Sequence, residues 1–299
     1  MFSTLGFWEL LRTAFQSTTG AWSFHPLQHA LTQRYMILGP LRNSLLLAVP
    51  VALAATVLVS LLDSWGQAYG PSHWTGLRYA ELLRSEELRR AVRNTLSLAL
   101  GSAVVGTAIA VVIAYAAQRF RQRLVGRLAL LADRVSFVAF AVPGLVIGLA
   151  LILAFSGGWL PLYGTQWILL VAYTLRFSGV GVRTVAARLS QIGIELEAAG
   201  QVAGLCRLRI LSNIVLPLLG PALVGSAVLI FVNAVKEISA TSLLASQGSE
   251  TLAYEAYVRF QEGNYTQGSA VSVVMIVLVI AVLLAGRLLG RSRPTGTTT

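Results

Sequence analysis

The stretch Glu195-Leu-Glu-Ala-Ala-Gly-Gln-Val-Ala-Gly-Leu-Cys-Arg-Leu-Arg-Ile-Leu-Ser-Asn-Ile-Val-Leu-Pro217 is polar, and it lies between apolar segments long enough to cross a bilayer. Its first part, up to Ala203, is rich in strong helix formers. Gly204 interrupts this pattern, and a second helical pattern then runs to Pro217, where we expect the chain to change direction. The stretch therefore predicts two short helices with a corner between them.

The composition indicates an all-α, polytopic membrane protein. Hydrophobic residues make up 56% of the chain and charged residues 12%, and the mean hydropathy is +0.71, which excludes a soluble globular protein. The single cysteine, Cys206, excludes an internal disulfide. About six segments approach the ~20 apolar residues that a spanning helix needs. These are Asn43–Leu62, Thr95–Ala117, Val135–Phe155, Trp167–Val182, Leu218–Val235 and Ser269–Leu289.

The net charge of +11 reports topology, because most Lys and Arg residues lie in alternate connecting segments. This bias predicts that both termini and the 187–217 loop face the cytoplasm, and it gives no support to a nucleic-acid partner. We expect an N-terminal segment on the inner leaflet at 1–42, in contact with membrane lipid, a transmembrane domain at 43–292 and a tail at 293–299. The stretch 77–93 carries alternating Arg and Glu between apolar residues, which predicts an amphipathic helix at the outer interface.

The loop resembles the Glu-Ala-Ala motif of the permeases of binding-protein-dependent ABC transporters, in which it docks onto the cytoplasmic ATPase. The matching residues are Glu197, Ala198, Ala199, Gly204, Ile214, Leu216 and Pro217. The register differs, because Glu-Ala-Ala lies one residue further from the glycine than in the usual pattern. Either Glu197 is displaced, or Ala198 stands where the glutamate normally does.

The resemblance implies a bacterial inner-membrane subunit that works with an ATPase dimer and a substrate-binding protein. The chain has no Gly-x-x-x-x-Gly-Lys-Ser/Thr loop, so ATP and magnesium are expected on the separate ATPase, and no cofactor or catalytic residue is assigned here. Six spans are half of the usual set, so we expect a second permease half, either another copy or a paralogue. Glu197, Ala198, Ala199, Gly204, Leu216 and Pro217 are the expected ATPase-coupling residues.

Two features inside the predicted spans point to the translocation path. Pro143 and Gly144 interrupt the backbone hydrogen bonds of the third span, which is tolerated where protein or a cavity receives the freed groups. Arg176 lies inside the fourth span, where a charge costs about 2.5–3.5 kcal/mol on insertion scales. Arg176 therefore faces a partner or water, or it extends to the inner interface.

The end of the fifth span, Lys236-Glu-Ile-Ser-Ala-Thr241, is similar to the same region of the permeases of ferric iron importers. Lys236, Glu237 and Thr241 are accordingly expected on the path. Acidic and tyrosine side chains of the following segment gather oxygen donors that suit Fe3+, although no metal site is assigned. Thiamine, sulfate or another small solute remains an alternative cargo. A secondary transporter that needs no ATP, or a structural membrane protein, is a further alternative.

Overall fold

The computed structural model describes residues 50–65, 74–157 and 162–291. The chain divides into two compact units, Met1–Leu58 and Val59–Thr299. The first unit is described at 50–58, within the helix Pro50–Leu61. The predicted N-terminal segment 1–42 and the tail 293–299 lie outside the described residues, and the fold below is that of the second unit.

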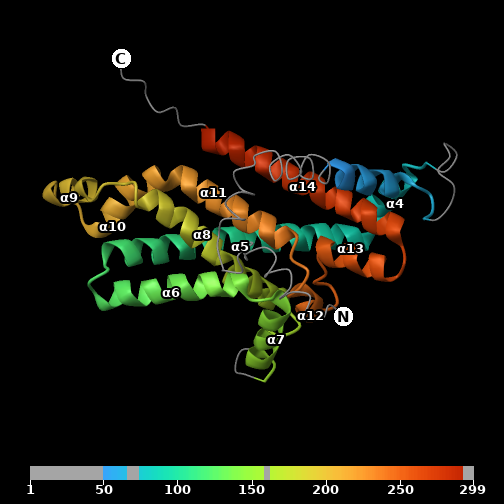
Figure 1. Cartoon of the computed structure of the whole chain (residues 1–299), viewed down its shortest axis with the longest axis horizontal. Helices are drawn as coiled ribbons and strands as arrows, with labels where there is room; N and C mark the ends of the chain where they lie inside the picture. Colours follow the sequence, from blue (N-terminus) through green and yellow to red (C-terminus); the bar gives the residue numbers. More distant parts are fainter. Residues whose placement is uncertain (1–49, 66–73, 158–161, 292–299) are drawn as a thin grey trace, which may run out of the picture. The chain divides into compact units, whose positions relative to one another are not determined.

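Five long helices form a bundle in this unit, and α8 lies at its centre (Figure 1). α8 packs against α5, α6 and α11, and 61% of its most apolar window is buried, compared with 22–33% for the other spans. The helices are α5 (Glu86–Arg119), α6 (Leu124–Ala141), α8 (Gln166–Leu189), α11 (Leu216–Val235) and α14 (Tyr265–Arg291).

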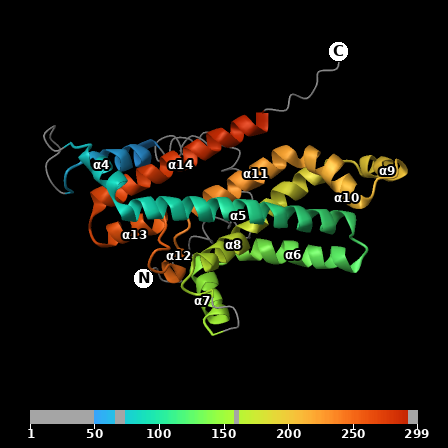
Figure 2. The same ribbon diagram turned by 180° about the vertical axis from the view of Figure 1, so that it is seen from behind.

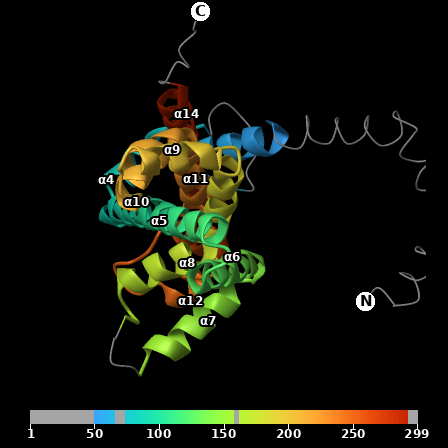
Figure 3. The same cartoon turned by 90° about the vertical axis from the view of Figure 1, so that its left-hand side faces the viewer.

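Shorter helices occupy the ends and the middle of the bundle. Figure 2 shows α9 (Ile194–Val202) and α10 (Arg207–Ile210) at one end, and α4 (Leu77–Arg84) and α13 (Leu252–Gln261) toward the other. Near the middle, α7 (Gly144–Phe155) packs on α8 and on α12 (Thr241–Leu244). Figure 3, which looks along the bundle, shows α7 diverging from the long helices.

Small residues let the central helices approach closely, as is usual where lipid provides no hydrophobic driving force between helices. A Cβ on Gly179 of α8 would lie 2.4 Å from the carbonyl oxygen of Ser136 on α6. A Cβ on Gly181 would lie 2.7 Å from Oγ of Ser226 on α11. The backbone of α8 is therefore held directly against both neighbours.

The all-α fold predicted from the sequence is confirmed, with differences in the spans. In the described part of the chain, four helices are long and apolar enough to cross a bilayer, or five if the pair α6 and α7 counts as one broken span. That pair bends by 115° at Pro143, so the predicted third span is not one straight helix. The first predicted span is described from residue 50 onward, and the count of six stays a prediction.

The sequence predicted one amphipathic interfacial helix at 77–93, but the structure does not form a separate helix over this stretch. Ser85 divides it: its Oγ accepts a hydrogen bond from the backbone N–H of Leu88 at 3.3 Å and caps a new helix. Residues from Glu86 onward are the first turns of the long helix α5. The charged turns are therefore a rigid extension of a membrane span.

Candidate functional site

The loop at one end of the bundle is fixed by a buried glutamate. Glu197, in the first turn of α9, is 6% exposed, and its Oε1 accepts a hydrogen bond from Nε of Arg119 at 2.6 Å. The hydroxyl of Tyr115 donates to its Oε2 at 3.0 Å, and Nη2 of Arg119 donates to the carbonyl of Ile192 at 2.9 Å. Both ends of this pair are thus satisfied, and α9 is anchored to the last turns of α5.

The corner after α9 is a helix-terminating motif centred on Gly204. Its φ is +80°, a left-handed conformation that favours glycine. The N–H of Leu205 donates to the carbonyl of Gly200 at 3.0 Å, and the N–H of Gly204 donates to that of Gln201 at 2.9 Å, the two bonds of a Schellman end. The predicted corner is confirmed, and its angle is set by hydrogen bonds.

The loop also presents apolar side chains that none of the described residues covers. Val202 is 90% exposed and Leu208 is 80% exposed, while Ile194 and Leu196 are about half exposed. Glu197 of α9 points toward Tyr115 and Arg119 of α5. The surface formed by Val202 and Leu208, called the docking face below, suits contact with another protein.

The predicted change of direction at Pro217 is wrong. The chain from Arg207 to Val235 runs as one span, because a π-helical turn at Leu211–Val215 joins α10 to α11. Pro217 is in the first turn of α11 and follows this π-helical turn by two residues. Movement of the loop is therefore carried into α11 by a continuous helix.

Within the loop motif, Glu197 is buried, and the two alanines that follow it are not. Ala198 and Ala199 are exposed, and Ala198 borders a pocket of about 270 Å3 with Tyr115 and Arg119. The carboxylate that faces the bundle belongs to Glu197 despite the extra residue before Gly204. Leu216 lies in the first turn of α11, next to Pro217.

A second polar cluster lies near the middle of the bundle, where two helices break. Arg176 of α8 makes an ion pair with Glu237, with 2.6 Å between Nη1 and Oε1, and their side chains are 16% and 7% exposed. Glu237 follows the end of α11, and its Oε1 also accepts the N–H of Ala240 at 2.8 Å. The sequence left open whether Arg176 faces a partner, faces water or extends to the inner interface. In the structure it faces a partner, Glu237, which lies at the end of the predicted fifth span.

The break between α6 and α7 reaches the same cluster. A Cβ on Gly144 would lie 2.1 Å from Nη1 of Arg176 and 2.8 Å from Oε1 of Glu237. Pro143, which precedes α7, is exposed. Thr241 is fully buried, and its Oγ1 donates to the carbonyl of Glu237 at 2.8 Å and lies 2.6 Å from the hydroxyl of Tyr173. All six predicted path residues thus lie on or beside the two breaks, with Lys236 directly after α11.

Lys236 differs from its neighbours in the chain. It is exposed while Glu237 is buried, so the structure separates two charges that are adjacent in the sequence. The predicted group of outer acids is also divided, because Glu250, Glu255 and Glu262 line a different pocket. The carboxylate at the helix breaks is that of Glu237.

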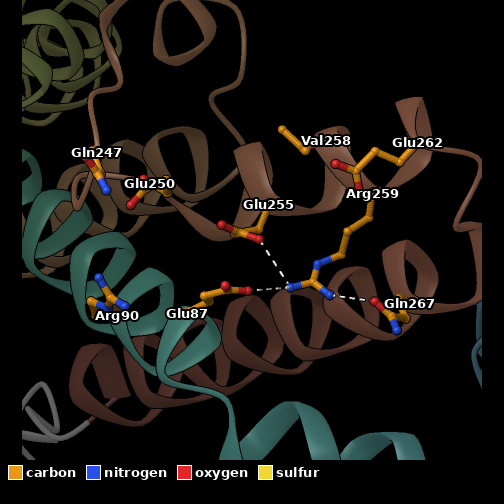
Figure 4. A pocket seen from close by; sticks show the side chains of 9 residues that line it. All are labelled: Glu87, Arg90, Gln247, Glu250, Glu255, Val258, Arg259, Glu262 and Gln267. Atoms are coloured by element: carbon orange, nitrogen blue, oxygen red, sulfur yellow. Dashed lines mark hydrogen bonds and ion pairs between the residues drawn. The ribbon is translucent and has the colours of Figure 1, made fainter.

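The outer acids surround Arg259 in a pocket of about 500 Å3 at the α13 end (Figure 4). Arg259 donates to Oε1 of Gln267 at 2.8 Å and to Oε2 of Glu255 at 3.3 Å, and it lies 3.9 Å from Glu87. Burial raises the pKa of Glu255 above its usual value of 4.5, and Arg259 offsets part of that rise. The pocket ties α13 to α14 and to the first turn of α5.

Sequence reasoning missed several residues that hold these sites. Arg119 was given no functional role from the sequence, and Tyr115 fell within the predicted span Thr95–Ala117. Asn94 donates through Nδ2 to the carbonyls of Gly248 and Glu250 at 2.9 and 3.0 Å, which fixes the segment between α12 and α13. A polar side chain within an otherwise apolar span was the available signal for such contacts.

Comparison with known proteins gives consistent matches. A family model described as "Binding-protein-dependent transport system inner membrane component" matches residues 106–292. The spermidine/putrescine transport system permease protein PotC of Escherichia coli (strain K12) is 25% identical over 264 residues, which are 86% of this chain and 97% of that protein. The Fe(3+)-transport system permease protein FbpB 2 of Haemophilus influenzae is 27% identical over 191 residues, 64% of this chain and 37% of that protein.

A solved structure shares the fold. The bacterial alginate ABC transporter, crystallised with an alginate pentasaccharide-bound periplasmic protein, contains a chain that aligns with a TM-score of 0.69. The alignment covers 90% of this chain and 96% of that chain at 13% identity. At that identity the similarity describes the arrangement of helices and carries no information about cargo.

Proposed function

This chain belongs to the family of binding-protein-dependent transport system inner membrane components. From that premise we propose that it imports a cation, with ferric iron as the preferred candidate, and that a partner subunit hydrolyses the ATP. The chain is a multi-pass inner membrane protein and the permease subunit of an ABC importer. The proposed partners are a cytoplasmic ATPase dimer, a substrate-binding protein and a second permease half. Both termini are proposed to be cytoplasmic.

The observation that carries the ATPase partnership is the two-sided construction of the loop. One side is held by the pair of Glu197 with Arg119, and the loop also presents the exposed docking face, formed by Val202 and Leu208. A rigid element with an apolar outer surface suits a groove in another protein. Closure of the ATPase dimer on ATP would move this loop, and α11 would pass that movement to the helix breaks as a rigid-body rotation.

The path is proposed to pass the two helix breaks in the middle of the bundle. Interrupted helices at this depth are tolerated where the backbone lines a cavity or is buried in protein. Charged residues within such a region usually mark the route of the substrate. Pro143, Gly144, Arg176, Glu237 and Thr241 therefore belong to the proposed path, and exposed Lys236 is proposed at its margin.

The choice of ferric iron rests on the resemblance of residues 236–241 to the ferric permeases and on the Fe(3+)-transport relative. A permease hands its cargo on, so it needs no tight metal site. The described residues contain no group of three or more His, Cys, Asp or Glu side chains that could hold a metal ion.

A second cargo is favoured by the length of the match. The spermidine/putrescine relative aligns over nearly its whole length, whereas the Fe(3+)-transport relative is aligned over 37% of its own. Polyamines are cations, so both candidates agree with a carboxylate at the helix breaks. Thiamine and sulfate remain the less supported cargoes.

The test is affinity purification of the tagged chain from its native membrane in mild detergent. Mass spectrometry identifies the partners, and metal and amine analysis identifies what the recovered binding protein carries. An ATPase together with an iron-loaded binding protein supports the proposal. A polyamine-loaded or anion-loaded binding protein would overturn the iron assignment, and recovery of the chain without any ATPase would overturn the mechanism.

A further inference from the structure

Two helix breaks meet at one point of the bundle, and an ion pair there joins α8 to the break after α11. α12, which follows the break after α11, packs against both α7 and α8, and α7 begins at the break after α6. Figures 1 and 3 show α7 and α12 side by side near the middle of the long helices. Arg176 belongs to the unbroken helix α8, and Glu237 belongs to a break. Their attraction therefore holds a breakable joint against a rigid element.

This pair differs from the pair that anchors the loop. The Arg119–Glu197 pair has hydrogen-bond geometry and two further bonds. At Arg176, by contrast, Nε finds no hydrogen-bond partner in the described part of the chain, and the contact of Nη1 with Glu237 is an ion pair without hydrogen-bond geometry. A buried guanidinium with unused donors is held mainly by charge, so another cation can replace it beside the carboxylate.

Gly144 closes the cluster from the side of α7. Because a Cβ there would lie 2.1 Å from Nη1 of Arg176 and 2.7 Å from Cβ of Ser239, the ion pair and the start of α7 fit together only with glycine. Any movement of α7 relative to α12 changes the space around the pair. The position of α7 and the state of the pair are thus coupled.

We propose that the Arg176–Glu237 pair is a latch that fixes the start of α12 to α8, which keeps α12 packed on α7 and closes the path, and that a cationic substrate replaces Arg176 beside Glu237 when the latch opens. The second part rests on the proposed function, because it requires a cation as cargo. The first part depends on this chain alone. Ser239 and Gly144 shape the latch, and Glu237 determines the sign of the charge that passes.

The test uses a disulfide across the joint that the latch holds. A Cβ on Gly148 of α7 would lie 3.4 Å from Cβ of Leu243 of α12, close to the ~3.5–4.5 Å found in disulfides. The cysteine pair Gly148→Cys and Leu243→Cys is introduced with Cys206→Ser, which removes the single native thiol. The rate of cross-linking is then measured in the purified transporter, at rest and with ATP and loaded binding protein.

With the latch intact, cross-linking at rest is expected to be fast, and to slow during turnover. Arg176→Met or Glu237→Gln should slow the resting rate by at least about tenfold, since each leaves one buried charge without its partner. The exchange of charges in Arg176→Glu with Glu237→Arg should restore part of the rate. Equal resting rates in the wild type and in the latch variants would overturn the proposal.

The matched control is the pair of Arg183 with Asp133, which joins α8 to α6 at 3.6 Å and is more exposed. Arg183→Met changes the same residue type on the same helix and should leave the resting rate unchanged. A fall as large as that of Arg176→Met would mean that any lost arginine loosens the bundle, and this would contradict a latch. Circular dichroism and gel filtration identify variants that fail to fold, and for those the slowing of the wild-type rate during turnover decides the outcome.

The resting measurement needs neither ATP nor cargo, so the two proposals fail separately. A working latch in a transporter that imports no cation would refute the proposed cargo and the exchange at Glu237, and leave the latch standing. If a cation is imported but the cross-linking rate at rest does not change when Arg176 or Glu237 is replaced, the latch is refuted and the proposed function stands.

Discussion

Nε of Arg119, at the end of α5, lies 2.6 Å from Oε1 of Glu197, in the first turn of α9. The two side chains are 13% and 8% exposed, so the pair is shielded from solvent. It joins the 187–217 loop to the end of α5. The loop therefore moves with the spans as one body.

Replacement of Glu197 by Lys should uncouple ATP hydrolysis from import. The change places a second cation against Arg119, and breaking a buried pair costs about 3–5 kcal/mol. We expect uptake to fall at least about tenfold, while membrane insertion is unchanged. The control is Glu195→Lys in the same turn of α9, since Glu195 is exposed. Normal uptake by an inserted Glu197→Lys variant would show that the anchor is dispensable.

The docking face should carry the affinity for the ATPase. Val202→Ser and Leu208→Ser remove apolar contact from side chains that are 90% and 80% exposed in this chain, so stability should be unchanged. We expect each to weaken binding by roughly 5- to 30-fold, or about 1–2 kcal/mol. Binding of the purified ATPase to the permease in nanodiscs measures this. Ser212→Ala, also in the loop, is the control, and an equal effect there would contradict a localised face.

The corner at Gly204 should tolerate some residues better than others. Nothing lies within 4 Å of a Cβ at this position, so the cost of a side chain comes from the backbone conformation at φ +80°. Gly204→Val should destabilise the loop by about 1–2 kcal/mol, and Gly204→Asn by less, because Asn adopts left-handed conformations more readily. Hydrogen exchange of residues 194–210 measures the difference. Equal exchange in the two variants would show that the left-handed turn does not hold the corner.

The outer pocket should give a pH dependence through Glu255. Its pKa in the folded protein is raised by burial, so the folded state binds the proton more tightly than the unfolded state. The stabilisation is complete below the usual value of 4.5 and is lost as the pH rises through the folded-state pKa. The melting temperature of the wild type relative to Glu255→Gln should therefore fall as the pH rises. A melting-temperature difference that stays constant as the pH rises would contradict this.

Much of the fold could be predicted from hydropathy, because a span must satisfy its backbone internally and so shows as a long apolar segment. The predicted spans 95–117, 167–182, 218–235 and 269–289 all fall within helices of the structure. Their ends were placed too short where charged residues continue a helix. Arg188, in the last turn of α8, and the charged turns after Ser85 are examples.

The tertiary contacts could not be predicted in the same way. A hydropathy pattern places Arg119 at a membrane boundary and Glu197 in a loop, but it does not predict whether these two residues are close in space. The interruption at Pro143 and Gly144 was predicted, but neither its 115° angle nor the close approach of Gly144 to Arg176 could be. The change of direction predicted at Pro217 does not occur, because a π-helical turn before the proline lets the helix continue through it. Such a turn could not be predicted from the proline alone.

The central claim is that this chain couples ATP hydrolysis on a partner subunit to the import of a cation. The most direct measurement is uptake into proteoliposomes that contain the permease, its ATPase and the loaded binding protein, with and without enclosed ATP. The account predicts uptake that requires ATP and binding protein, resists a proton uncoupler and is lost in Glu197→Lys. Uptake that continues without ATP and is abolished by the uncoupler would contradict it.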